Sequence, residues 1–240
     1  MLGPFDYVLV LLGLLAEAYV VLRLCLSEKF LRYFSLNIYM LGVVGVTIGQ
    51  DFALLKFGVS SPAYAYVYYY TDALLTIALF FVIMSFYQQV FHQMGVGKYV
   101  RWTSVFLLSA TALFSYLVVR RMPSHHLTSR FAVEMSQNLY FVGVVLTYLL
   151  WGAILKLRET RTRLIQLVLA LGIFFSADAA AYALRSLFPG LEANFLKWVP
   201  PLVGTFLPLA WAYTFTKISE DARLETARVA LPRMAAHQHS

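Results

Sequence analysis

The stretch from Tyr64 to Phe91 reads YAYVYYYTDALLTIALFFVIMSFYQQVF and determines the fold class of this chain. Apart from Asp72 it contains no charged residue. About 20 predominantly apolar residues are enough to cross the hydrocarbon core of a bilayer as a helix. This stretch therefore predicts a transmembrane helix.

Similar apolar runs fill the rest of the chain, which is 60% hydrophobic and only 13% charged. Soluble domains usually carry about a quarter charged residues. The runs lie near residues 5–26, 34–57, 64–91, 100–119, 132–155, 164–187 and 194–216. We expect an all-α polytopic membrane protein, with a bundle of seven transmembrane helices over residues 1–217. A cytoplasmic tail with a short helix is expected over residues 218–240.

The basic residues are distributed unevenly between the two sets of predicted loops. Of the 19 Lys and Arg residues, 13 fall in alternate connections and the tail, and six fall on the other side. Because cytoplasmic loops carry the excess of Lys and Arg, the pattern predicts an outside N-terminus and a cytoplasmic C-terminus. Arg120, Arg121 and Arg130 argue against this orientation, since they lie in a predicted outer loop.

Acidic residues interrupt five of the apolar runs: Glu17, Asp51, Asp72, Glu134 and Asp178. A charged side chain at the centre of a bilayer costs about 2.5 to 3.5 kcal/mol on insertion scales. Such a residue must be partnered, protonated or hydrated, so it is a candidate for function. Glu134 is close to a helix start and is expected at the interface.

Helical spacing gives two of these acids polar neighbours on their own helices. Tyr68 and Tyr69 lie one turn from Asp72, and Tyr182 and Arg185 follow Asp178 by four and seven residues. We expect an outward-opening pocket lined by Asp51, Asp72, Asp178 and these tyrosines and arginine, with Glu17 deeper on the first helix. Carboxylates beside aromatic rings suit a small cation or a proton. The alternative is that each acid only fixes helix positions through hydrogen bonds.

Gly45 and Gly49 are separated by three residues in the second apolar run. This small-xxx-small spacing lets two helices approach closely. We expect it to pack inside the bundle, and the alternative is a homodimer face.

Motifs for enzymatic chemistry are missing from the sequence. It contains no HExxH, GxSxG, P-loop or CxxCH pattern, and Lys197 is too close to a helix end for a retinal Schiff base. We expect no enzyme activity, no cofactor and no metal site. The net charge of +7 is explained by the loops, so we expect no nucleic-acid partner.

Two stretches resemble a family of uncharacterised seven-helix integral membrane proteins common in Acidobacteria. They are the run from Ala63 to Phe91 and the run LALGIFFSADAAAYALRS from Leu169 to Ser186. The resemblance implies the fold and a multi-pass location in a bacterial inner membrane. It implies no activity and no residue roles.

Three functions are compatible with these features. The first is a non-enzymatic accessory or scaffold subunit of a larger bacterial membrane complex, which contacts lipid and protein partners through its small-residue helices and tail. The second is a sensor or receptor with an outward-facing acidic and aromatic pocket for a small cationic ligand. The third is a proton- or cation-coupled transporter.

Overall fold

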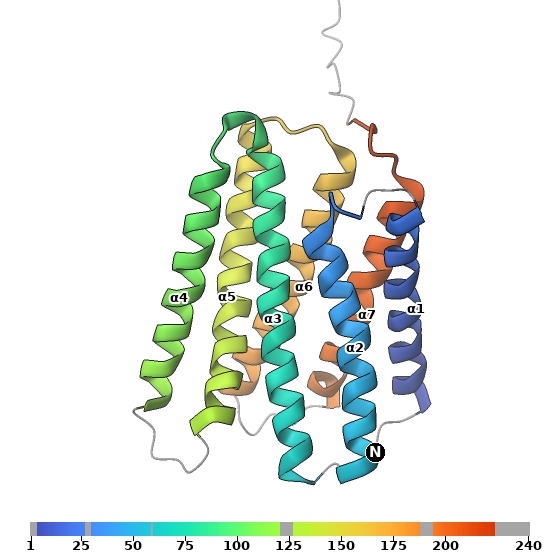
Figure 1. Ribbon diagram of the computed structural model, residues 1–240, viewed down its shortest axis with the longest axis vertical. Helices are drawn as coiled ribbons and strands as arrows, with labels where there is room; N and C mark the ends of the chain where they lie inside the picture. Colours follow the sequence, from blue (N-terminus) through green and yellow to red (C-terminus); the bar gives the residue numbers. More distant parts are fainter. Residues whose placement is uncertain (1–3, 27–29, 59, 121–126, 188–193, 224–240) are drawn as a thin grey trace, which may run out of the picture.

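The computed structural model describes residues 4–26, 30–58, 60–120, 127–187 and 194–223, and within them it contains seven α-helices (Figure 1). The helices are α1 Pro4–Leu26, α2 Phe34–Phe57, α3 Pro62–Val90, α4 Gly97–Arg120, α5 Leu127–Lys156, α6 Thr162–Leu187 and α7 Asn194–Lys217, with a short 3-10 helix η1 His92–Met94 before α4. Among the described residues, six helices are long and apolar enough to span a membrane: α1 to α6. The predicted all-α class is confirmed, and the chain is a multi-pass membrane protein.

The helix ends follow local signals in the sequence. Pro62 is the first residue of α3, and the Ser61 side chain accepts a hydrogen bond from the Ala63 N–H at 3.2 Å. Gly58 and Gly95 end α2 and η1 with φ angles of 78° and 68°. Residues with a Cβ rarely adopt this left-handed backbone, so glycine fits both positions.

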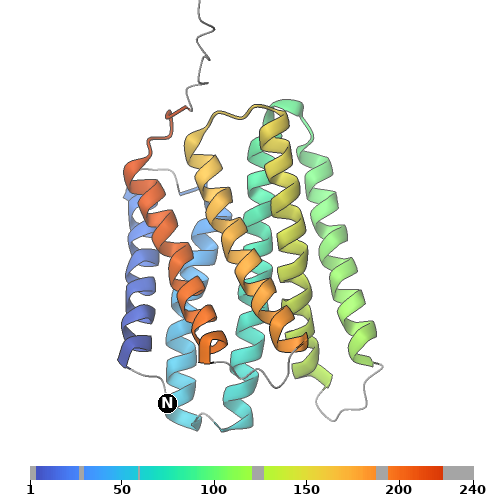
Figure 2. The same ribbon diagram turned by 180° about the vertical axis from the view of Figure 1, so that it is seen from behind.

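Six helices form a closed ring, and α4 lies outside it. Around the ring, α1 packs on α2, α2 on α3, α3 on α5, α5 on α6, α6 on α7, and α7 returns to α1. α4 packs mainly on α5 and more weakly on α3 (Figures 1 and 2). The amide nitrogen of Asn138 donates to the buried Ser115 hydroxyl at 2.9 Å and so joins α5 to α4.

The ring consists of two halves with the same order of contacts. In α1–α2–α3 and in α5–α6–α7, the middle helix packs on both of its neighbours, and the first helix of each half packs on the last helix of the other. Both halves also run in the same direction along the bundle (Figure 1). The sequence has no evident repeat, so this equivalence is visible only in the structure. We call the end where α1, α3, α5 and α7 finish the basic end.

Glycines form a tight contact between α5 and α6 and an open stripe on α2. A Cβ on Gly143 would lie 2.4 Å from the Phe175 ring, whereas a Cβ on Gly45 or Gly49 would meet nothing within 4 Å. The expectation that Gly45 and Gly49 pack inside the bundle is wrong, because both are exposed on α2. The close approach of helices occurs at Gly143 instead.

At the basic end, the segment after α7 is tied to the start of α6. Arg163 donates through Nε to the Ile218 carbonyl at 2.9 Å, and Glu220 pairs with Arg32 and Arg163. The backbone N–H of Thr162 donates to the carbonyl of Ala222 at 3.2 Å. Residues 218–223 are therefore not helical, and the rest of the short helix expected in the tail lies outside the described residues.

The connection between α5 and α6 provides a pH-dependent contact. Arg161 binds both carboxylate oxygens of Glu159, at 2.9 and 2.6 Å, and donates to the Gln89 carbonyl at the end of α3. These hydrogen bonds hold the pKa of Glu159 below its ordinary value of 4.5. Because the pKa of Glu159 is lower in the folded protein, the ionised carboxylate stabilises the fold at a pH above the ordinary pKa. This stabilisation is lost as the pH falls through the lowered pKa.

We predict that Glu159→Gln lowers the free energy of unfolding by about 0.5 to 1 kcal/mol at neutral pH, since the pair is partly exposed and screened. The difference from wild type should shrink to nothing in acid, where Glu159 is protonated. Thermal unfolding of both proteins in nanodiscs measures this difference, over a range of about pH 3 to 7 that brackets the ordinary pKa of a glutamate. Arg158→Gln, an exposed neighbour, is the control, and a pH-independent difference for Glu159→Gln would contradict the prediction.

Candidate functional site

Three of the acids predicted as site residues lie on the inner side of the ring. Glu17 of α1 is 5% exposed and Asp178 of α6 is 8% exposed. Asp72 of α3 is half-buried. Helices from both halves of the ring therefore contribute carboxylates to its interior.

Two buried tyrosines connect these acids. Tyr39 of α2 interacts electrostatically with Glu17, Asp178 and Asp72. Tyr140 of α5 interacts in the same way with Asp72 and Asp178. Both tyrosines are 9% exposed. We call Glu17, Tyr39, Asp72, Tyr140 and Asp178 the acid–tyrosine cluster.

Hydroxyl groups surround Asp72. Ser136 of α5 is 1% exposed, and its Oγ faces the Asp72 carboxylate without the full geometry of a hydrogen bond. Thr76 donates to the Asp72 backbone carbonyl at 2.8 Å, and its side chain also faces the Tyr140 phenol. Small movements can therefore bring a hydroxyl onto this carboxylate.

Glu17 carries an unsatisfied atom. Its Oε2 is buried and has no hydrogen-bond partner among the described residues. An unpartnered carboxylate oxygen is costly in a membrane interior unless a proton or another cation reaches it. Glu17 is thus the member of the cluster that most needs a ligand.

Tyr182 and Arg185 are the predicted partners of Asp178 on α6. The Tyr182 ring packs against Tyr140, with ring centroids 5.5 Å apart, so it lies at the edge of the cluster. Arg185 belongs to α6, and its side chain lies outside the described part of the structure.

The structure does not bring the remaining predicted residues into the cluster. Asp51 is exposed on α2. Tyr68 and Tyr69 are 45% and 37% exposed on α3, although helical spacing puts them one turn from Asp72. The tyrosines beside the acids are Tyr39 and Tyr140.

Residues that the sequence reasoning missed come from α2 and α5. On α5, Ser136, Tyr140, Gly143 and Thr147 follow one another at spacings of four, three and four, so polar and small residues form one stripe of an otherwise apolar helix. That stripe predicts which side of α5 faces the interior of the bundle. Tyr39 has no such stripe, because only Ser35 is polar among its neighbours three and four residues away on α2.

The cluster is not a metal centre of the usual kind. Among the described residues, no group of three or more His, Cys, Asp or Glu side chains could hold a metal ion. Carboxylates and phenols in one buried site can instead accept, share and release protons.

Comparison of the chain with protein-family models, curated proteins and solved structures gives no match.

Proposed function

We propose that this protein is a proton-coupled membrane transporter and that the acid–tyrosine cluster is its proton site. The observation that carries the proposal is the position of the cluster between the two halves of the ring. Glu17, Tyr39 and Asp72 come from one half, and Tyr140 and Asp178 come from the other. In many transporters built from repeated halves, the coupling ion binds where the halves meet, and access alternates as one half rocks against the other.

Packing around the cluster favours a proton over a larger cation. Glu17, Tyr39, Tyr140 and Asp178 are each less than one-tenth exposed, and aromatic rings pack on both tyrosines. An amine ligand would require these rings to move apart, while a proton needs no added volume. The alternative, a receptor for a small cationic ligand, therefore has less support than proton binding.

The proposed chemistry is electrostatic. A buried carboxylate is costly when it is ionised, and binding of a proton or access of water removes that cost. Asp72 and Asp178 belong to different halves, so proton binding favours close approach of the halves and proton release favours their separation. Ser136 and the tyrosine phenols supply hydroxyl groups that can stabilise either state.

The proposal includes the orientation and location of the chain. We infer that the 24-residue α7 is the seventh span and that the basic end faces the cytoplasm of a bacterium, across the inner membrane. The connections, the tail and the adjoining helix ends on this side contain 13 of the 19 Lys and Arg residues, which supports this orientation. An accessible-cysteine assay at Cys25 and at an added cysteine in the 58–61 connection tests it.

The first test asks whether the cluster titrates. Trp211 is fully buried, with its ring centroid 6.1 Å from that of Tyr39, so its fluorescence reports on the cluster. With Trp102, Trp151 and Trp198 changed to Phe, we expect the emission in nanodiscs to change in a step with pH. Glu17→Gln, Asp72→Asn and Asp178→Asn should each shift or remove that step, and the exposed Asp51→Asn should not.

The second test asks whether protons cross the membrane. In proteoliposomes containing a pH-sensitive dye, wild-type protein should acidify the lumen when a candidate solute and a membrane potential are applied. Asp72→Asn and Asp178→Asn should reduce this flux at least tenfold while inserting normally, and Asp51→Asn should retain it. If the fluorescence step and the proton flux both persist after the cluster acids are substituted, these acids have only a structural role.

A second candidate function, an accessory subunit of a membrane complex, is favoured by the open Gly45–Gly49 stripe. Neither glycine has a neighbour within 4 Å of its Cβ position, so another helix could approach α2 there. Purification from the native membrane should then recover partner proteins, and Gly45→Leu with Gly49→Leu should release them. Recovery of a lone monomer from wild-type membranes would exclude this function.

A further inference from the structure

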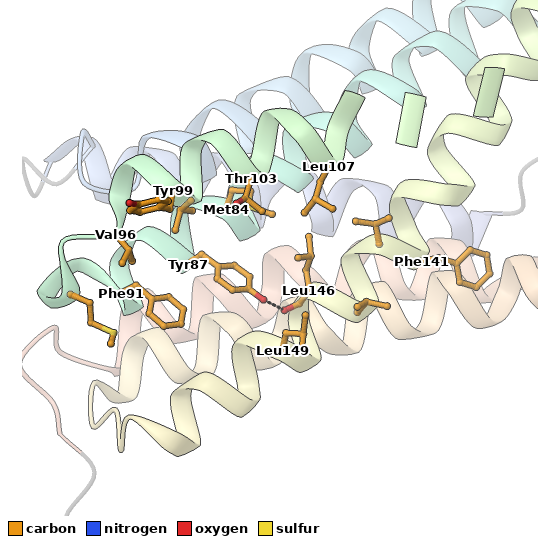
Figure 3. Close-up of a pocket in the computed structure, with 14 residues that line it drawn as sticks. Met84, Tyr87, Phe91, Val96, Tyr99, Thr103, Leu107, Phe141, Leu146 and Leu149 are labelled. Carbon is orange, nitrogen blue, oxygen red and sulfur yellow. Dashed lines mark hydrogen bonds between the residues drawn. The ribbon is translucent and has the colours of Figure 1, made fainter. Parts of the chain in front are cut away.

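A groove of about 650 Å³ lies between α3, α4 and α5 near the basic end (Figure 3). Its walls are almost entirely apolar and include Met84, Phe91, Leu107, Phe141, Val145 and Leu149. Met94 and Tyr99, at its end, are 58% and 75% exposed, so the groove is open to its surroundings. Because α3, α4 and α5 meet the length and composition criteria for membrane spans, we infer that the groove opens to lipid.

The Tyr87 hydroxyl, which points across the groove, is already engaged in a hydrogen bond. Tyr87 donates its phenol hydrogen to the Leu146 carbonyl at 2.6 Å, as drawn in Figure 3, and its ring stacks on Phe91. Among the described lining residues, only Tyr99 and Thr103 carry other polar side-chain atoms. A hydrocarbon chain suits such a surface, whereas a polar solute would lose its hydration without gaining hydrogen bonds.

A positive charge lies beyond the open end of the groove. Lys156 follows Leu149 by seven residues on α5, with Gly152 between them, so all three lie on one side of the helix. A Cβ on Gly152 would meet nothing within 4 Å, which leaves an open path from the groove to Lys156. Lys156 is exposed and has no ion-pair partner in the described part of the chain.

We propose that the groove binds one acyl chain of an anionic phospholipid and that Lys156 binds its phosphate. From Phe141 to Leu149 the groove follows α5 for about 12 Å, enough for a large part of an acyl chain. The charge of Lys156 selects an anionic headgroup at the level where headgroups are found. The bound chain fills the space between α4 and the ring, and so fixes the position of the helix outside the ring.

The test is native mass spectrometry of the purified protein, titrated in detergent with phosphatidylglycerol or phosphatidylcholine. Wild-type protein should bind one phosphatidylglycerol molecule most tightly. Lys156→Ala should weaken that binding about fivefold, which is the usual effect of one basic residue near an anionic headgroup. Lys156→Arg should restore it. Val145→Trp, which fills the groove, should remove the tight site for both lipids.

The matched control is Lys98→Ala on α4. Tyr99, Val100, Thr103 and Leu107 form the groove face of α4, and the helical period puts Lys98 on the opposite face at the same membrane end. Lys98→Ala should leave phosphatidylglycerol binding unchanged. The proposal would be overturned if Lys98→Ala and Lys156→Ala weakened phosphatidylglycerol binding equally, or if Val145→Trp still bound it as tightly as wild type. It would also be overturned if the purified protein carried a neutral apolar molecule at this site and no phospholipid.

Discussion

Trp211→Ala is expected to lower the free energy of unfolding by about 3 kcal/mol. Trp211 is fully buried on α7. It packs edge-on against Tyr39 of α2, and its Nε1 donates to the Leu167 carbonyl of α6 at 3.3 Å. Loss of a buried Trp side chain usually costs about 3 to 5 kcal/mol. The lower end applies here, because packing in a membrane lacks the hydrophobic driving force found in water.

The control for Trp211 is Trp102 on α4, which is 75% exposed. Trp102→Ala should change the free energy of unfolding by less than about 0.5 kcal/mol. Both variants can be compared by equilibrium unfolding in mixed micelles. Since Trp211 also supports Tyr39, Trp211→Ala should in addition reduce the proton flux in the proteoliposome assay. Equal effects of the two alanine variants would mean that α7 does not pack in the ring as described.

Gly143→Ala is expected to lower the free energy of unfolding by about 3 kcal/mol through overpacking. The added Cβ would lie 2.4 to 2.7 Å from three atoms of the Phe175 ring. That ring cannot easily move, because Phe175 is 1% exposed and packs against Tyr140 and Phe174. The strain therefore has to separate α5 from α6.

Two variants distinguish overpacking from a general effect of adding a methyl group. Gly45→Ala, where the Cβ meets open space, should be neutral or stabilising by up to about 1 kcal/mol, because alanine favours helix. Adding Phe175→Leu to Gly143→Ala should recover part of the loss, since the smaller side chain makes room. Unfolding of all variants in the same micelles gives the comparison. A neutral Gly143→Ala would show that α5 and α6 are not in close contact.

The helices could be predicted from the sequence, because the bilayer sets a minimum apolar length that few other structures need. Each predicted run overlaps one helix, and the ends differ by at most five residues, at the start of α5. The interior positions of Glu17, Asp72 and Asp178 also fit the general cost of a carboxylate in lipid, whereas the exposed Asp51 does not follow it.

The rotation of α2 could not be predicted in the same way. Lipid-facing and core-facing residues are both apolar in a membrane helix, so periodicity does not reveal which side faces inward. The sequence pattern therefore groups Asp51 with the other acids, although it is exposed, and does not reveal Tyr39, which lies among them. The order of helices around the ring depends on contacts between distant segments, which no local pattern contains.

The position of α4 outside the ring has a consequence for how such a chain could arise. α3 and α5 are neighbours that point the same way, so the chain must cross the membrane once more between them, and α4 provides this crossing. A gene encoding three helices, once duplicated in tandem, would place its second copy upside down. One added helix between the copies, as α4 is here, gives the second three-helix unit the same orientation as the first. The two units can then pack side by side in parallel around a shared interior.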